Sequence, residues 1–246
     1  MTLAILSALP DEQRGLIEQL QQPQRVLHAG REFWLGQLQG HSVVLALSKI
    51  GKVAAATTAT ALIEKFGAQC IVFTGVAGGI GPGVQVGDVV VAQALVQHDM
   101  DASPLFARYQ VPFYGQSSFT ADPPLTALLL QACTTAMGAM GALGQAGSVH
   151  HGLLASGDQF VSGAQAADIL RRDLALAGHH ALAVEMEGAA VAQVCHDYGL
   201  PFAAVRTISD RADASAHVDF TVFARDVAGH YACAIVQALL NLLLIK

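Results

Sequence analysis

The sequence predicts an α/β fold that occupies residues 1–246 as one domain. Short apolar runs typical of buried strands alternate with segments typical of helices, and no internal repeat or low-complexity linker interrupts them. A length of 246 residues allows a large core and is common for a single α/β domain. The hydrophobic fraction of 53% and the 24 glycines indicate compact packing of small residues.

The N-terminal half begins with strand and helix signals that follow one another closely. Pro10 with the acids Asp11 and Glu12 opens a helix, because proline and acidic side chains favour the first helical turn. The turn residues Gly40 and His41 separate two runs that form a hairpin. The predicted elements are a strand at 3–8, a helix from Pro10, a hairpin of 31–39 and 42–47, a helix up to about residue 65, and a strand at 70–74.

Residues 75–83 are the stretch richest in glycine, and they follow the strand at 70–74. Glycine lets a backbone approach a ligand closely or adopt positive φ, although a simple turn is the alternative. The glycines do not fit GxGxxG, a strand at 88–92 follows instead of a helix, and no GK[ST] is present. The spacing therefore argues against a P-loop and against a dinucleotide-dependent oxidoreductase.

Residues 97–119 form an irregular segment rich in aromatic residues, histidine and proline. A loop of this length in a compact domain is usually functional, so we expect a lid or a subunit contact. His98, Asp99 and Asp101 lie within it, but no fourth ligand stands at a suitable spacing, and we predict no metal site.

The C-terminal half continues the alternation of helices and strands. Small residues after residue 187 are typical of a helix packed tightly on a sheet. The predicted elements are a helix at 124–137, a strand at 150–155 that leads into 156–161, a strand at 182–184, a helix at 188–195, a strand at 201–210 and a helix from about 220.

Carboxylates follow the ends of several predicted strands. Glu185 and Glu187 lie in an otherwise apolar run of a protein with only 13% charged residues, so each needs a partner or a ligand once buried. Open α/β sheets bind ligands at the carboxyl ends of their strands. The alternative is that either acid caps the following helix through its N-terminal amides.

The strand at 201–210 carries the next group of polar residues. With a period of two, Arg206, Ile208 and Asp210 share one face, and Asp210 stands at the strand's end. Glu12 is a further carboxylate beyond a strand end, although first-turn acids are also ordinary helix-dipole partners. Together these carboxylates predict an acid/base site.

Composition excludes several classes of function. A net charge of −6 with only four lysines argues against a nucleic-acid surface, which needs clustered cations. The four cysteines are isolated in apolar segments, which predicts reduced thiols and a cytoplasmic location. The apolar run at 232–245 is interrupted by Gln237 and Asn241, so we expect a packed final helix rather than a membrane segment.

Five motifs, taken together and in this order, cover nearly the whole chain. They are residues 8–12, residues 48–53, residues 74–79 with 86–88, residues 155–160, and residues 184–187 with 206–210. The combination resembles the purine nucleoside phosphorylase/nucleosidase superfamily, and specifically the 5′-methylthioadenosine/S-adenosylhomocysteine nucleosidases. The resemblance implies a three-layer α/β/α phosphorylase/hydrolase-like fold with a mixed, partly barrel-like central sheet, a homodimer, and no metal or organic cofactor.

The resemblance also implies a reaction, the hydrolysis of the N-glycosidic bond of 5′-methylthioadenosine, S-adenosylhomocysteine and 5′-deoxyadenosine. Asp210 would donate a proton to purine N7, which makes adenine a better leaving group as C1′ becomes oxocarbenium-like. Glu12 would act as the base on the attacking water, with Arg206 close to that water. Glu187 would accept hydrogen bonds from the ribose hydroxyls.

The remaining implied contacts surround the nucleoside. Met186 would lie against the ribose, Phe160 on the purine face, and the backbone of Val161 at the adenine edge. Val76 stands where many family members have serine, so the backbone would have to serve near the water. The other implied contacts are Leu9, Ile50 and Phe220 at the 5′-alkylthio group, Phe106 from the neighbouring subunit, and Ala77, Gly78, Glu185 and Ser209 in the substrate site.

Three alternatives stay open. A phosphorylase on the same fold would need cationic donors for phosphate, but Phe73 stands where related phosphorylases carry arginine, and residues 7–11 carry acids. A hydrolase of another nucleoside, such as futalosine, fits the same motifs. A nucleoside-binding or sensor module without activity is the third alternative, although binding alone does not require Glu12, Glu187 and Asp210 together.

Overall fold

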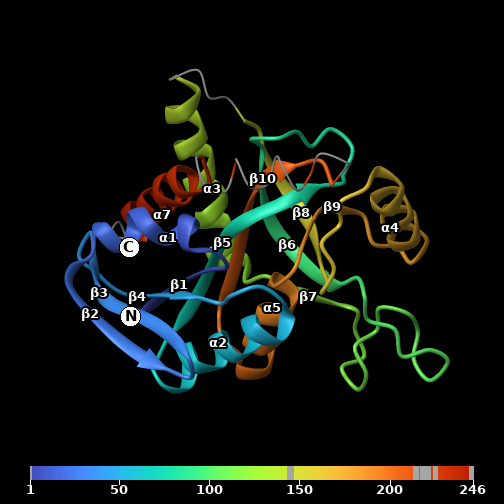
Figure 1. The fold of residues 1–246 in the computed structure, drawn as a ribbon, viewed down its shortest axis with the longest axis horizontal. Helices are drawn as coiled ribbons and strands as arrows, with labels where there is room; N and C mark the ends of the chain where they lie inside the picture. The colour runs from blue at the N-terminus through green and yellow to red at the C-terminus, as the bar shows by residue number, and fades with distance from the viewer. Residues whose placement is uncertain (1, 143–146, 213–215, 217–222, 224–226, 244–246) are drawn as a thin grey trace.

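The computed structural model describes residues 2–142, 147–212, 216, 223 and 227–243. Its elements alternate between strands and helices over most of this range (Figure 1). They are β1 Leu3–Ser7, α1 Pro10–Glu18, β2 Gln21–His28, β3 Arg31–Leu38, β4 His41–Leu47, α2 Lys52–Glu64, β5 Cys70–Gly79, β6 Val89–Gln97, β7 Ser118–Thr120, α3 Pro123–Gly141, β8 Val149–Ser156, α4 Ala164–Leu176, β9 Ala181–Glu185, α5 Gly188–Tyr198, β10 Phe202–Asp210 and α7 Gly229–Leu243.

Five strands close into a barrel. β5 pairs with β10, β10 with β6, β6 with β8, β8 with β9, and β9 again with β5. The β5–β10, β6–β8 and β8–β9 pairs are parallel, whereas β6–β10 and β5–β9 are antiparallel. From β5 the sheet continues outward through β1, β4, β3 and β2, and β7 pairs with β6. The predicted mixed, partly barrel-like sheet is therefore confirmed.

Most helices cover the sheet in two groups that each enclose an apolar core, whereas α4 packs separately beside β9 (Figure 1). Helices α2 and α5 pack together, and their buried Leu62 and Val191 join a core cluster with Phe73 of β5. Helices α1 and α3 both contact α7, and Leu129 and Leu239 belong to a second cluster on that side. The predicted α/β/α layering is confirmed, while the organisation of residues 1–246 as one domain stays a prediction.

The glycine-rich stretch differs from its prediction. We expected the strand to end at residue 74, but β5 continues through Gly79. Gly75 and Gly78 pair with Arg206 and Asp210 of β10, and Gly78 also pairs with β9. Strands on both sides supply hydrogen-bond partners for this backbone, which outweighs the weak strand propensity of glycine. The alternative of a simple turn is therefore wrong for residues 75–79.

Strand β2, helix α4 and the three-residue strand β7 were not predicted from the sequence. Strand β2 is mostly exposed and begins with polar residues and Pro23, so it lacks the alternating apolar signal, and it is held by antiparallel pairing with β3. Helix α4 did carry a helical signal, because Ala167, Leu170 and Leu174 recur at spacings of three and four residues.

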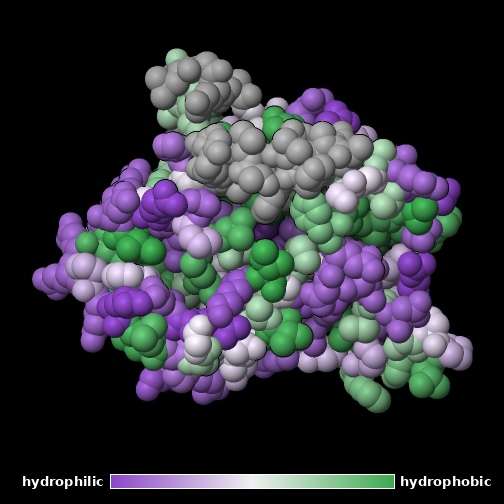
Figure 2. All heavy atoms as spheres, viewed as in Figure 1, coloured by the Kyte–Doolittle hydropathy of each residue, from purple (hydrophilic) through white to green (hydrophobic). Residues whose placement is uncertain are grey.

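The segment between β6 and β7 is irregular, as predicted, and projects from the body of the molecule (Figure 1). Leu105 is 84% exposed and Phe113 is 93% exposed. Figure 2 shows hydrophobic side chains at the tip of this projection. Over the residues that the structure describes, no helix combines the length and apolar character needed to span a membrane.

Candidate active site

A cavity of about 330 Å³ lies where β1, β5, β9 and β10 reach their carboxyl ends. Apolar groups predominate in its lining, and five of the lining residues are ionisable. The lining residues are Ala8, Leu9, Glu12, Ile50, Gly75, Val76, Ala77, Gly78, Gln159, Phe160, Val161, Val184, Glu185, Met186, Glu187, Arg206, Ser209 and Asp210.

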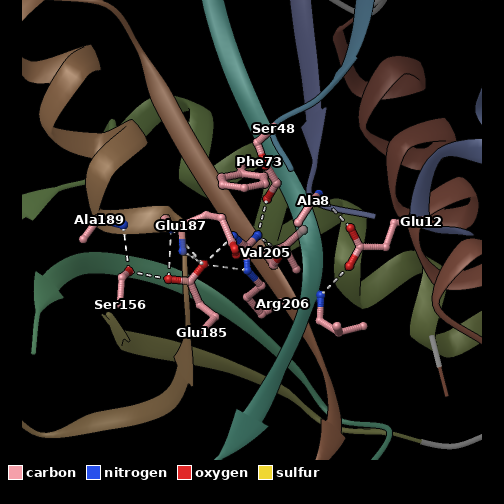
Figure 3. A network of polar contacts seen from close by, with 12 residues as sticks. Ala8, Glu12, Ser48, Phe73, Ser156, Glu185, Glu187, Ala189, Val205 and Arg206 are labelled. Atoms are coloured by element: carbon pink, nitrogen blue, oxygen red, sulfur yellow. Dashed lines mark hydrogen bonds and ion pairs between the residues drawn. The ribbon is translucent and has the colours of Figure 1, made fainter. Parts of the chain in front are cut away.

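Glu12 is held by backbone amides at one end of the cavity. One carboxylate oxygen accepts hydrogen bonds from the amides of Ala8 and Leu9 at 2.8 and 2.9 Å, and the other accepts one from the amide of Val76 at 3.1 Å (Figure 3). Burial raises the pKa of Glu12 above its ordinary value, although these amides and Arg206 oppose the rise. A carboxyl group with a raised pKa suits proton transfer near neutral pH.

Arg206 and Glu185 form a buried ion pair beneath the cavity. The Nη2 atom of Arg206 donates to Oε2 of Glu185 at 2.6 Å, and both side chains are at most 2% exposed. The Nη1 atom of Arg206 donates to the carbonyls of Phe73 and Val205, and the guanidinium carbon lies 4.0 Å from the centre of the Phe73 ring. Arg206 is therefore fixed by contacts within the protein (Figure 3).

Glu185 also holds the start of α5. Its carboxylate accepts hydrogen bonds from the amide of Gly188 at 2.8 and 2.9 Å and from the hydroxyl of Ser156. The hydroxyl oxygen of Ser156 in turn accepts a hydrogen bond from the amide of Ala189 at 2.8 Å. The helix-capping alternative is thus correct for Glu185. Its carboxylate is bound mainly by protein groups, although the residue also lines the cavity.

Glu187 stands beside this pair, but its environment is different. One carboxylate oxygen accepts a hydrogen bond from the amide of Gly51 at 2.9 Å, and the side chain makes no hydrogen bond that caps α5. Burial and the neighbouring charge of Glu185 raise the pKa of Glu187 to about 8. The capping alternative is wrong for Glu187, whose carboxyl group reaches the cavity instead.

Asp210 lies at the end of β10 and is 2% exposed. Its carboxylate accepts hydrogen bonds from the hydroxyl of Ser209 and the amide of Ala212, both at 2.8 Å. A Cβ atom on Gly78 would stand 2.9 Å from Oδ1 of Asp210. Only glycine therefore lets β5 pass this close to the carboxyl group.

The predicted common face of Arg206, Ile208 and Asp210 is wrong. The register of β10 against β5 shifts between Ile208 and Asp210. Such a bulge interrupts the alternation of side chains. Ile208 consequently packs in the core, while Ser209 and Asp210 both line the cavity.

The phosphorylase-superfamily model matches residues 2–241 of the chain. A 5′-methylthioadenosine/S-adenosylhomocysteine nucleosidase of Shewanella denitrificans is 36% identical over 241 residues, which are 98% of this chain and 99% of that protein. The chain belongs to this nucleosidase family within the phosphorylase superfamily. It is therefore an N-glycosyl hydrolase.

Solved structures agree with this membership. The nucleosidase of the same name from Neisseria meningitidis, in complex with methylthio-immucillin-A, is 35% identical and has a TM-score of 0.85 over 97% of this chain and 98% of that chain. A futalosine hydrolase of Helicobacter pylori is 30% identical and also has a TM-score of 0.85, over 98% of this chain and 97% of that chain. The fold is thus common to nucleosidases with different names.

The structure brings most of the predicted site residues of this nucleosidase to the cavity. Phe106 does not line the cavity of its own chain and instead contacts the ring of Phe113, with the ring centroids 5.4 Å apart. Phe220 lies outside the described residues. The predicted residues that line the cavity are Leu9, Glu12, Ile50, Ala77, Gly78, Phe160, Val161, Glu185, Met186, Glu187, Arg206, Ser209 and Asp210.

Ser156 and Gln159 are two further residues of the site that had no predicted role. Ser156 is fully buried at the end of β8 and bonds to Glu185, while Gln159 lines the cavity. Their signal was the polar run that directly follows an apolar strand. Within the described ranges, no three His, Cys, Asp or Glu side chains are grouped so that they could hold a metal ion.

Proposed function

We propose that this nucleosidase hydrolyses the N-glycosidic bond of 5′-methylthioadenosine and S-adenosylhomocysteine, and also accepts 5′-deoxyadenosine. The observation that carries the proposal is that Glu12, Glu187 and Asp210 face one largely apolar cavity. A nucleoside needs apolar walls for its base and 5′ group, and acid/base groups at its glycosidic bond. The names of the related proteins support this choice of substrates.

Asp210 is the proposed general acid. It transfers a proton to N7 of the purine while the bond between C1′ and N9 breaks, so that adenine leaves as a neutral molecule. The hydrogen bonds from Ser209 and Ala212 fix the orientation of its carboxyl group. Orientation of the proton donor before reaction lowers the entropic cost of the step.

Glu12 is the proposed general base. It removes one proton from the attacking water as the water oxygen bonds to C1′, which yields the 5-substituted ribose and returns a proton to the enzyme. The amides of Ala8, Leu9 and Val76 hold its carboxylate without a side-chain hydroxyl at position 76. The backbone of Val76 therefore substitutes for the serine of other members.

The carboxyl oxygens that line the cavity favour a cationic transition state. Glu12, Glu185, Glu187 and Asp210 contribute carboxyl groups, whereas Arg206 is the cationic lining residue in the described part of the chain. Positive charge that develops at C1′ is stabilised by such groups when they are fixed in advance. Glu187 additionally binds the ribose hydroxyls, with Met186 against the sugar.

The remaining lining residues suit the rest of the nucleoside. Phe160 is 46% exposed and offers its ring to the purine, and the backbone of Val161 offers polar groups to the adenine edge. Leu9 and Ile50 supply an apolar surface for the 5′-alkylthio group. We include Phe220 in this surface on the strength of the resemblance alone.

Water rather than phosphate is the proposed nucleophile. Phosphate binding needs cationic or bidentate donors. The donors of Arg206 are engaged by Glu185 and by main-chain carbonyls, and Phe73 fills the adjacent position with a buried ring. The lining of the cavity therefore favours hydrolysis.

The proposed assembly is a homodimer in which the loop around Phe106 contacts the partner's site. Support comes from the projecting segment, where Leu105 and Phe113 expose large apolar side chains. Exposed apolar groups of this size mark association surfaces when they lie together. The cytoplasmic location stays a prediction from the isolated cysteines.

An adenine-release assay tests the proposed function. Purified protein is incubated with 5′-methylthioadenosine in phosphate-free buffer, then again with phosphate, and the sugar product is identified by mass spectrometry. Free methylthioribose without a phosphate requirement is the expected result. A sugar 1-phosphate formed only with phosphate would show that the enzyme is a phosphorylase. The absence of adenine release in both buffers would contradict the proposed substrate.

Futalosine is the second candidate substrate. The observation in its favour is the futalosine hydrolase of Helicobacter pylori, which matches this fold as well as the methylthioadenosine enzyme does by TM-score. The same assay with futalosine separates the two candidates. A kcat/KM for futalosine that exceeds the value for 5′-methylthioadenosine would assign the enzyme to the second substrate.

A further inference from the structure

Two short loops supply the outer walls of the cavity. Ile50 lies between β4 and α2, and Phe160 lies between β8 and α4. Both side chains are about half exposed, at 56% and 46%, so packing alone holds them weakly. Both loops nevertheless border the same cavity, so a link between them would constrain its outer walls.

Three charged residues from separate segments provide such a link. The backbone amide of Lys52 donates to Oδ1 of Asp158 at 2.8 Å, and the amide of Asp158 donates to Oδ2 of Asp99 at 2.9 Å. The ammonium group of Lys52 then closes the ring with a bond of 2.5 Å to Oδ1 of Asp99. We call Lys52, Asp99 and Asp158 the Lys52 clasp. It joins the segments that follow β4, β6 and β8.

The clasp is partly sheltered from solvent. The side chains of Lys52 and Asp99 are 16% and 24% exposed, so their ion pair is screened less than a surface pair. The ammonium group also donates to the side-chain oxygen of Gln97 at 3.3 Å. Burial raises the pKa of Asp99, but the hydrogen bonds from Lys52 and from the Asp158 amide outweigh it and keep that pKa below its ordinary value.

Local structure shows that Lys52 is not placed for helix stability. It is the first residue of α2, where the helix dipole disfavours a cation, and the first turn contains no acid. The preceding Gly51 has φ of +99°, and a Cβ atom there would lie 3.2 Å from Oδ1 of Asp158. The backbone is thus adapted to bring residue 52 against Asp158.

The clasp is connected to the cavity on both sides. Ile50 precedes Lys52 by two residues, Phe160 follows Asp158 by two, and the amide of Gly51 donates to Glu187. We infer that the Lys52 clasp fixes the two loops at the width of the nucleoside, which makes Lys52 a positioning residue for substrate binding. The inference rests on the proposed function, because Ile50 and Phe160 are assigned there to the two ends of the substrate.

Lys52→Met tests the inference, since it removes the ammonium group and keeps most of the aliphatic chain. Lys65→Met is the matched control, because Lys65 is exposed at the other end of α2. We expect Lys52→Met to raise KM for 5′-methylthioadenosine at least about fivefold with kcat changed less than about twofold, as for lost ground-state binding. Lys65→Met should leave KM and kcat unchanged. Lys52→Arg should have a KM between those of wild type and Lys52→Met.

Hydrogen exchange of the protein without substrate provides an independent readout. Lys52→Met should speed amide exchange in residues 157–161, which are far from position 52 in sequence, whereas Lys65→Met should not. Unchanged exchange there, or a lower Tm with unchanged KM, would overturn the inference. If Lys52→Met does not fold, Asp99→Asn weakens the same ion pair, and an unchanged KM and exchange rate in that variant would also overturn it.

The two proposals fail in distinguishable ways. Absence of turnover by the wild-type protein would contradict the proposed substrate, while the exchange experiment would still report on the clasp. Normal wild-type turnover combined with unchanged exchange and KM in Lys52→Met would contradict the clasp and leave the proposed reaction intact.

Discussion

The burial of Glu187 predicts a pH dependence of stability that one substitution removes. Its pKa is raised from 4.5 to about 8 in the folded protein, whereas the unfolded chain has the ordinary value. Between these two pH values the folded protein retains a proton that the unfolded chain has released. A rise in pH therefore favours unfolding throughout this window.

The magnitude follows from the shift. Each pKa unit corresponds to about 1.4 kcal/mol, so the contribution of this group to the free energy of unfolding falls by about 3 kcal/mol between pH 5.5 and 7.5. Glu187→Gln removes the titrating group but keeps an oxygen that can accept the hydrogen bond from Gly51. The free energy of unfolding of Glu187→Gln should therefore not fall over this pH range in the way that it does for wild type.

Urea unfolding at several values between pH 5.5 and 7.5 measures the difference. From pH 5.5 to pH 7.5, the free energy of unfolding of Glu187→Gln should rise by about 3 kcal/mol relative to that of wild type. Glu18→Gln, an identical change at an exposed position of α1, is the control and should run parallel to wild type. Wild-type and Glu187→Gln curves that stay parallel would refute the reasoning, because Glu187 would then be ionised throughout.

Four further predictions concern activity. Asp210→Asn should lower kcat at least about 10³-fold while 5′-methylthioadenosine still binds by calorimetry, since an amide cannot deliver a proton; wild-type turnover would remove Asp210 from its role. Glu12→Gln should cost about 10²-fold or more in single-turnover rate, and full activity would place the base elsewhere. Gly78→Ala should lower kcat about tenfold or more, because the new methyl group displaces the Asp210 carboxyl group. Light scattering should find a dimer, and Phe106→Ala should raise KM; a fully active monomer would contradict this interface.

Local sequence patterns were sufficient for most elements. Apolar runs at the starts of β1, β5 and β10 identified these strands, because a strand buried on both faces requires apolar residues. The acids Glu12, Glu187 and Asp210 were recognisable because charge is rare in such surroundings. Strand β2 escaped prediction because its register depends on pairing with β3 rather than on its own polar sequence.

The partners of the polar residues required the tertiary structure. Glu185 could have been a ligand contact or a helix cap, and the sequence offered no way to decide between them. The fold brings Arg206 and Ser156 to its carboxylate from 21 and 29 residues away. Likewise, burial and the nearby charge of Glu185 raise the pKa of Glu187 to about 8, and neither cause is visible in the local sequence.

The sequence by itself determined the residue types at the carboxyl ends of the strands, since short apolar runs and the polar groups after them are local features. Tertiary structure alone decided that these ends surround one cavity. The pairing of β10 with β5 closes the barrel and brings Asp210 beside Gly78. Such contacts arise from hydrogen bonds between segments more than 100 residues apart, and no local pattern records which segments will pair.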